Sequence, residues 1–250
     1  MIVVLIHHPK SCLSILQSAS DLAQKFQKSF GIVIRTAQNV DIQDETSVLY
    51  SEFNPDYRRL VLPNETIQQI TDETEASFLF IQPVSLKVRY LQSILNESRD
   101  LRIPYLVFPD TFSPLIPEKV LVPVNFLIEE IEKAQFAAAF GRFCNAAICL
   151  LTANDYGSKA RTNTQKICSV LDQFGLQYLQ QTGRKDSFKI EYDAIAKAKE
   201  EHYNLIIASA SREYGLDDII FGPKELHLIR KSPVPVMLIN PRGDLYTLCD

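Results

Sequence analysis

Two adjacent histidines, His7 and His8, follow the apolar run Ile2–Ile6 at the start of the chain. Imidazole nitrogens can bind a metal ion, or act as a general base near neutral pH. Adjacent residues on a strand point to opposite faces, so the pair cannot chelate one ion unless the chain turns there. No Cys, Asp or Glu follows at a ligand spacing. We therefore expect a hydrogen-bonded or partly exposed histidine pair and no metal site.

Paired carboxylates and activated nucleophiles could serve acid–base or covalent chemistry. The adjacent pairs are Glu129-Glu130 and Asp217-Asp218. Neighbouring side chains diverge on a helix or loop, so a solvated face is expected for both pairs. No Gly-x-Ser-x-Gly elbow is present to support a hydrolase. The sequence identifies no catalytic residue, and whether the chain is an enzyme stays open.

The cysteines are odd in number and lack metal-site spacing: Cys12, Cys144, Cys149, Cys168 and Cys249. Cys168 falls on the apolar side of a helical pattern, and Cys144 and Cys149 flank or enter an apolar run. We expect Cys144, Cys149 and Cys168 to lie in or near the core. A redox role stays open for Cys144 and Cys149. Nothing directs the chain to an oxidising compartment, so a reducing cytoplasm fits best.

Glycine is scarce where a phosphate loop would need it. The chain has 8 glycines, and Gly31 is the only one before Gly141. Phosphate-binding loops use glycine so that backbone N–H groups can approach the anion closely. Neither the dinucleotide fingerprint nor the P-loop pattern occurs. An ordinary phosphate loop is therefore excluded from the first half.

Composition places these residues in a globular α/β chain. The 250 residues are 46% hydrophobic and 22% charged, and 26 basic residues against 30 acidic ones leave a net charge of -4. This balance provides no overall positive field for nucleic acid or anionic lipid, so neither partner is predicted. The first apolar run is too short for a membrane span or a signal peptide. The length allows two small domains.

Apolar runs alternate with helical periodicity in the first half, the pattern of a parallel sheet covered by helices. The predicted strands are Ile2–Ile6, Gly31–Ala37, Arg59–Pro63, Ser77–Ile81 and Ile103–Phe108. The predicted helices are a stretch from Leu13 that stops at Gly31, then Asn64–Asp72 and Leu86–Leu101. Gln38–Tyr57 is weakly patterned and is expected to be a loop or short helix.

The same order starts again in the second half. The predicted strands are Val120–Val124, Ala146–Ala153, Leu176–Gln181, Leu205–Ala208 and Val234–Ile239. The predicted helices are Ile128–Phe143, Thr162–Phe174, Tyr192–Tyr203 and Lys224–Lys231. An internal duplication explains this repeat best, and two unrelated α/β domains are the alternative.

Matching residues support the duplication. Thr36-Ala37 ends the second predicted strand of the first half, and Thr152-Ala153 ends its counterpart. The proline-containing stretch Asp110–Glu118 is the expected linker. We therefore expect two domains, residues 1–113 and 114–250, each with a mostly parallel five-stranded open sheet and helices on both faces.

Three stretches of the second half carry a recognisable pattern: the apolar strand Val120–Phe126, the alanine-rich helix Glu129–Phe140, and Asn204–Asn240 with its order of strand, loop, helix and strand. On these stretches the second half resembles the universal stress protein family, whose opening strand usually ends in Pro-x-Asp-x-Ser. The first half is similar mainly in element order, so the whole chain looks like a tandem member with two such domains.

The resemblance implies a ligand crevice outside the carboxyl ends of the first and fourth strands. Many family members hold ATP there, with an Asp on the nucleoside and Gly-x-x-Gly-x9-Gly-Ser/Thr around the phosphates. The corresponding positions here form a degenerate ATP site: Asn125, Ala153, Ser209, Arg212 and Gly222.

Most of these positions depart from the pattern. Asn125 lacks the charge of the Asp, and Ser209 and Arg212 replace the first two glycines. Pro223 stands at the Ser/Thr position and has neither an N–H nor a hydroxyl. We expect Gly222 to cap a helix that starts at Pro223. Arg212 is expected to be solvated, with a rebuilt phosphate contact as the alternative.

The first half is four residues shorter between the matching positions Ile81 and Pro104, so its loop is expected to be deleted. The resemblance implies a cytoplasmic stress-response or regulatory protein that acts through a small ligand or a protein partner, without a cofactor. The alternative is an ATP-binding switch with slow hydrolysis, using ATP held weakly in the second domain. An intramolecular pseudo-dimer is expected, and a further homodimer stays open.

Overall fold

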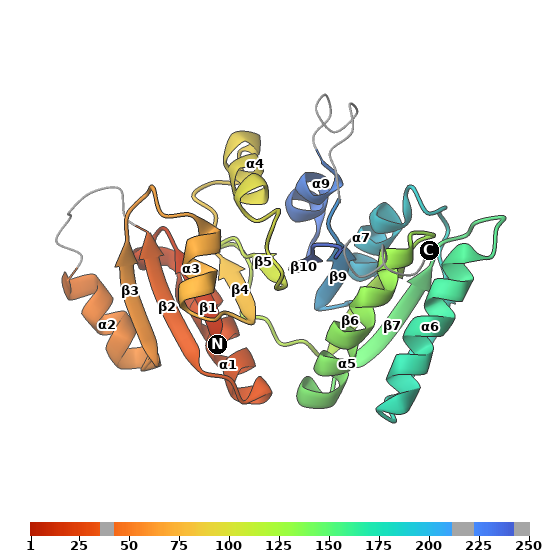
Figure 1. Ribbon diagram of the computed structural model, residues 1–250, viewed down its shortest axis with the longest axis horizontal. Coiled ribbons are helices and arrows are strands. Elements are labelled where there is room, and N and C mark those ends of the chain that lie inside the picture. Colours follow the sequence, from red (N-terminus) through yellow and green to blue (C-terminus); the bar gives the residue numbers. More distant parts are fainter. Residues whose placement is uncertain (36–42, 212–222, 243–250) are drawn as a thin grey trace. The chain divides into compact units, whose positions relative to one another are not determined.

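A computed structural model describes residues 1–35, 43–211 and 223–242 of this α/β chain (Figure 1). The chain divides into two compact units, Met1–Ile116 and Pro117–Asp250. The sequence places this boundary three residues earlier, between residues 113 and 114. Each unit contains parallel strands joined by helices, the architecture expected from alternating apolar runs and helical patterns.

The strands of the first unit lie in the order β3-β2-β1-β4-β5. Their bounds are β1 Ile2–Ile6, β2 Phe30–Arg35, β3 Tyr57–Val61, β4 Phe78–Ile81 and β5 Tyr105–Val107. β1 pairs in parallel with β2 on one side and β4 on the other, and all five of its residues are buried. A central strand covered on both faces needs such a continuous apolar run, which is why it can be recognised in the sequence.

The helices of the first unit connect these strands. They are the 3-10 helix η1 Pro9–Ser11 and the α-helices α1 Leu13–Phe26, α2 Gln43–Phe53, α3 Ile67–Glu73 and α4 Val88–Glu97. α3 begins with a capping box, in which Thr66 accepts from the Gln69 N–H and the Gln69 side chain accepts from the Thr66 N–H.

The strands of the second unit lie in the order β10-β9-β6-β7-β8. Their bounds are β6 Lys119–Val124, β7 Ala147–Thr152, β8 Tyr178–Thr182, β9 Leu205–Ser209 and β10 Val236–Ile239. β6 occupies the place that β1 has in the first unit, between its second and fourth strands. The order therefore reverses beside β6, which makes this the switch point of the sheet.

The helices of the second unit are η2 Ile128–Glu132, α5 Lys133–Cys144, α6 Lys159–Gln173, α7 Ile190–Glu200 and α9 Lys224–Lys231. α5 and α6 pack on each other and on β6 and β7, while α7 packs on α9 and also covers β6 and β7 (Figure 1). Because right-handed crossovers on either side of the switch point lead to opposite faces, the two pairs of helices cover the sheet from both sides.

The predicted elements are present, with shifted ends. The first helix was expected to continue to Gly31 but ends at Phe26, because Gln27 takes a left-handed conformation with φ 53° and closes the helix with its own N–H. The weakly patterned stretch Gln38–Tyr57 contains α2. The expected Ile128–Phe143 helix is split, with a 3-10 turn before α5. Thr36-Ala37 lies outside the described residues.

Part of the proline-containing linker belongs to the first unit. The Ser11 hydroxyl donates to an Asp110 carboxylate oxygen at 2.6 Å, and the Leu115 N–H donates to the Ser18 hydroxyl at 2.8 Å. Leu115 is buried. These contacts attach residues 110–115 to η1 and α1, so only the last few residues of the expected linker separate the units.

Across the described residues, no helix has both the length and the apolar character that crossing a membrane requires.

Candidate functional site

The switch point of the second unit brings together the carboxyl ends of β6 and β9. Val120 and Leu121 of β6 pair with Leu205 and Ile206 of β9, so the two strands run side by side toward Asn125 and Ser209. Asn125 and Ser209 are 3% and 5% exposed. The crevice that the sequence predicts at this edge is therefore lined by side chains that the fold has largely buried.

Asn125 uses its polar groups to close the turn after β6. Its Oδ1 accepts from the Leu127 N–H at 2.8 Å, and its own N–H donates to Glu130 Oε2 at 2.9 Å. The Asn163 side chain of α6 donates to the Asn125 carbonyl at 3.0 Å. A side-chain oxygen that caps its own turn is a local structural device. Asn125 therefore shapes this end of the strand, and its acceptor is already occupied.

Glu130 corrects the expectation of a solvated carboxylate pair. Its side chain is completely buried, and Glu130 Oε2 lies 2.7 Å from Lys133 Nζ, three residues on. Lys133 is also buried and donates to the Pro123 carbonyl. Burying a carboxylate is costly unless it is paired and hydrogen-bonded, and Lys133 with the Asn125 N–H supplies both contacts. Only Glu129 of the pair faces solvent.

A second buried carboxylate lies at the start of α9. Glu225, in the first turn of this helix, is 1% exposed and accepts the Ser211 N–H with Oε1. A carboxylate at a helix N-terminus is favourable because the unpaired N–H groups there carry partial positive charge. Among the described residues, Glu225 Oε2 and Glu130 Oε1 have no hydrogen-bond partner.

Lys224 links these carboxylates electrostatically. Its Nζ lies 3.1 Å from Oε1 of Glu191 on α7. Burial lowers the pKa of Lys224, but the carboxylates of Glu191, Glu130 and Glu225 outweigh that effect and raise the pKa above its ordinary value. This buried acidic cluster, defined as Glu130, Glu191 and Glu225 with Lys133 and Lys224, has three carboxylates against two ammonium groups. Acidic side chains therefore outnumber basic ones in this cluster by one.

Pro223 corrects the expected start of the helix. Pro223 has an extended backbone with ψ 153° and is itself the residue that precedes the first helical turn, so α9 begins at Lys224. The expected capping residue, Gly222, and Arg212 both lie outside the described residues. Ala153 is buried after β7, and its N–H donates to the Val124 carbonyl at 2.9 Å.

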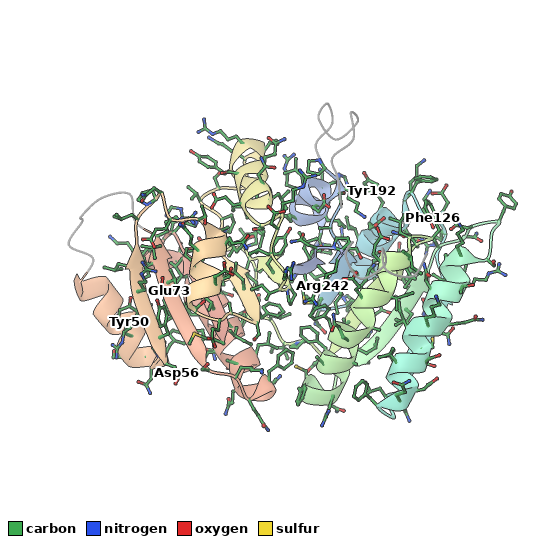
Figure 2. All side chains as sticks on the ribbon, in the orientation of Figure 1. Tyr50, Asp56, Glu73, Phe126, Tyr192 and Arg242 are labelled. Carbon is green, nitrogen blue, oxygen red and sulfur yellow. The ribbon has the colours of Figure 1, made fainter. Side chains whose placement is uncertain are left out.

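Aromatic side chains stand at the rim of this edge. Phe126, which follows Asn125 and is labelled in Figure 2, packs edge-on against Phe188 with ring centroids 5.4 Å apart. Phe188 is 78% exposed. The Phe126 N–H donates to the Ser187 hydroxyl, which in turn donates to Asp155. These contacts fix the loop before α7 beside the end of β6.

Sequence reasoning missed the buried acidic cluster. The spacing of three between Glu130 and Lys133 suits a helical ion pair, and Lys224-Glu225 opens a predicted helix. Both signals are common on solvated helices, so neither shows burial without the packing of the surrounding helices.

Comparison with solved structures relates this arrangement to known proteins. A universal stress protein from Archaeoglobus fulgidus matches with a TM-score of 0.66 at 16% identity, over 95% of this chain and 98% of that chain. The functionally unknown protein PA1789 from Pseudomonas aeruginosa PAO1 matches with a TM-score of 0.69 at 10% identity, over 96% and 92%. No protein-family model and no curated protein matches the chain.

The chain has the universal stress protein fold. A third structure comes from Pseudomonas aeruginosa UCBPP-PA14 and is provisionally assigned as a universal stress protein. It matches with a TM-score of 0.65 at 11% identity, over 96% of this chain and 92% of that chain. The fold class predicted from the sequence is thus confirmed across nearly the whole chain.

In the first unit, the corresponding edge of this fold is closed by Gln82. This fully buried side chain follows β4, and its Oε1 accepts the N–H groups of both His7 and His8, at 2.9 and 2.8 Å. Its Nε2 donates to Asp110 at 2.6 Å and to the His8 carbonyl at 3.3 Å. Backbone groups at the end of β1 that could face a ligand are therefore bonded to the protein itself.

The connection after β4 is also short. β4 ends at Ile81 and α4 begins at Val88, whereas β9 ends at Ser209 and α9 begins at Lys224. This difference agrees with the shortened loop expected from the sequence. The first unit of this universal stress protein fold has little chain with which to surround a phosphate.

The histidine pair is hydrogen-bonded and partly exposed, as the sequence predicts. Burial, followed by the charge of Arg35, lowers the pKa of His7 to about 4, so its imidazole is neutral at physiological pH. His8 Nε2 lies 3.1 Å from the Val84 carbonyl. Within the described ranges, no group of three or more His, Cys, Asp or Glu side chains is arranged to hold a metal ion.

Cys12, Cys149 and Cys168 are free thiols. Cys149 and Cys168 are buried as expected, and Cys144 is partly exposed. Burial raises the pKa of Cys149 and of Cys168, and it raises that of Cys12 to about 11. Thiols with raised pKa values are poor nucleophiles at neutral pH. This argues against the redox role that the sequence left open for Cys149.

Proposed function

We propose that this chain is a cytoplasmic stress-response or regulatory protein that acts by binding a protein partner or small ligand, with its nucleotide site degraded. The single observation that carries the proposal is Glu225. Its buried carboxylate, in the first turn of α9, accepts the N–H of Ser211, which follows β9. A built-in anion therefore takes a backbone donor in the region where the resemblance places the phosphates.

The charge of the buried acidic cluster supports the same conclusion. A triphosphate beside Glu130 and Glu225 would add like charges in a region of low dielectric, where repulsion is strong. Pro223 supplies neither an N–H nor a hydroxyl, and the Asn125 oxygen is already engaged with Leu127. Each missing hydrogen bond to a charged phosphate is worth about 1.5–3 kcal/mol.

The proposed role rests on the shared fold and on the rim. Universal stress protein structures cover nearly the whole chain, which favours a stress-related role. The exposed Phe188, held in place against Phe126, is suited to anchor a partner, since aromatic side chains carry much of the binding energy at interfaces. The free thiols suit a reducing cytoplasm.

Isothermal titration with Mg-ATP tests the proposal. The intact chain is expected to bind with a dissociation constant weaker than about 100 μM, because two lost phosphate contacts cost about 3–6 kcal/mol. A constant tighter than about 10 μM would favour the ATP-binding switch and overturn the proposal. Recovery of adenine nucleotide from natively purified protein would also favour the ATP-binding switch.

A restoring variant tests the placement of the loop. Ser209→Gly, Arg212→Gly and Pro223→Ser together rebuild the family pattern, and adding Glu225→Gln removes the competing charge. The variant with all four substitutions is expected to bind Mg-ATP at least tenfold more tightly than the parent. The variant with only the first three should gain less affinity, because the Glu225 carboxylate still repels the phosphates. Equal affinity in the two variants would contradict the role given to Glu225.

A further inference from the structure

A second cavity of the second unit lies apart from the crevice. Its volume is about 220 Å³, and it opens between α6 and the ends of β7 and β8. α6 contributes Arg161, Thr164 and Gln165, while the strands contribute Thr152, Gln180, Gln181 and Thr182. None of these residues belongs to the buried acidic cluster or to the degenerate ATP positions, so this polar pocket is a separate feature.

The pocket follows from the spacing of its residues. Arg161, Thr164 and Gln165 stand at positions i, i+3 and i+4 of α6 and so share one face of the helix. Thr152 pairs with Thr182 across the sheet, and Gln180 lies two residues earlier on the same face of β8. A helix normally seals such a seam with apolar side chains, but here every one of these six is polar.

Arg161 gives the pocket its charge. It is the only charged residue in the lining, no Asp or Glu is present there, and no ion pair of Arg161 is found within the described residues. Its side chain is exposed, so it is accessible to an anion that enters from solvent. A guanidinium presents a planar fork of donors that matches the two oxygens of a carboxylate or phosphate.

The base of the pocket adds adjustable hydrogen bonds. The hydroxyl oxygens of Thr152 and Thr164 are 2.8 Å apart, and both residues are buried. Thr164 can donate to the Ala160 carbonyl at 3.0 Å or to Thr152, so one hydroxyl hydrogen can be turned toward a ligand. The amides of Gln165 and Gln180 can donate or accept beside them.

We propose that the polar pocket binds a small metabolite through an oxyanion group, carboxylate or phosphate, held by Arg161. The glutamine amides and the threonine pair then contact polar groups on the rest of the molecule. The cavity is smaller than the roughly 300–1,000 Å³ of sites for drug-sized ligands, which limits the ligand to a compact one. This binding is independent of the proposed loss of nucleotide binding, since the two sites share no residue.

Amide NMR titration of the full chain with inorganic phosphate and, separately, with succinate tests this site at constant ionic strength. At least one anion is expected to shift the Thr164, Gln165 and Gln180 signals saturably, with a dissociation constant below about 5 mM. A stronger response to succinate assigns a carboxylate ligand, and a stronger response to phosphate assigns a phosphate ligand. Absence of saturable shifts with both anions up to about 20 mM overturns the proposal.

Two variants make the test specific. Arg161→Gln removes the charge and is expected to weaken binding at least tenfold, whereas Lys166→Gln removes the same charge from an exposed residue of α6 outside the lining and should change it less than twofold. Both side chains are exposed, so neither variant should affect folding. If both variants weaken anion binding equally, the binding arises from general surface charge. That result would overturn the assignment to this pocket.

Discussion

Replacing Lys133 by methionine should strongly destabilise the second unit. The Glu130–Lys133 pair is fully enclosed, with 1% exposure of each side chain and 2.7 Å between Lys133 Nζ and Glu130 Oε2. Removing one partner of a buried pair leaves the other charge uncompensated and typically costs about 3–5 kcal/mol. The Pro123 carbonyl also loses its donor. Against a stability of about 5–15 kcal/mol for a typical domain, that is a large fraction.

Guanidinium unfolding followed by far-ultraviolet circular dichroism measures this loss as a lower midpoint. The double variant Glu130→Gln with Lys133→Met should recover at least half of it, because it removes both charges and keeps an acceptor for the Asn125 N–H. Lys197→Met is the control, since Lys197 and Glu201 form a more exposed pair and losing it should cost less than about 1 kcal/mol.

Two results would refute this reasoning about the buried pair. One is a Lys133→Met variant whose free energy of unfolding lies within about 1 kcal/mol of the parent. The other is a double variant that is less stable than Lys133→Met alone, because the lost stability would then not arise from an uncompensated carboxylate.

Three further predictions concern other buried groups. The imidazole of His7 stays neutral in the fold to a pKa of about 4, while the unfolded chain protonates near 6.5, so stability present above pH 6.5 is lost as the pH falls toward 4. The parent should therefore lose about 2 kcal/mol of its free energy of unfolding between pH 7.5 and pH 5, and the His7→Gln variant should not. The same pH dependence in both proteins would contradict this. Gln82→Leu should lower the free energy of unfolding by about 2–4 kcal/mol, because two strand-end N–H groups lose their acceptor; a change under about 1 kcal/mol would count against that role. A Cβ at Gly183 would lie 2.5 Å from Ile190 Cδ1, whereas nothing lies within 4 Å of one at Gly157. Thermal unfolding should show Gly183→Ala destabilised by about 1–3 kcal/mol and Gly157→Ala nearly unchanged, and equal effects would refute the overlap.

The strands were predictable because each central one is an uninterrupted apolar run. Ile2–Ile6 is buried on both faces and needs no partner in the sequence to be recognised as a strand. Helix ends were harder to predict. α1 ends where Gln27 adopts a left-handed conformation, and no residue pattern indicates that conformation. The edge strand β8 begins two residues later and ends one residue later than predicted, because a partly exposed strand lacks a strong apolar signal.

The sequence correctly predicts that Asn125 and Ser209 lie at the ends of neighbouring strands, as the order of elements requires. It does not predict their surroundings, because Glu130 and Glu225 stand in helical patterns and their burial has no sequence signature. A glutamate in a helical pattern is expected to be exposed to solvent, and only the packing around it can show that it is buried.

Local residue types and their spacing were enough to predict the alternation of strands and helices, the repeat of that order, and the loss of the glycines and hydroxyl that a phosphate loop requires. Three features became visible only in the folded chain: Gln82 binds both histidine N–H groups, Glu225 accepts the Ser211 N–H, and Arg161 lines a pocket together with Thr152 and Thr164. Each of these depends on burial and on contacts between distant segments, and the free energy of a charged or polar group is set by what surrounds it.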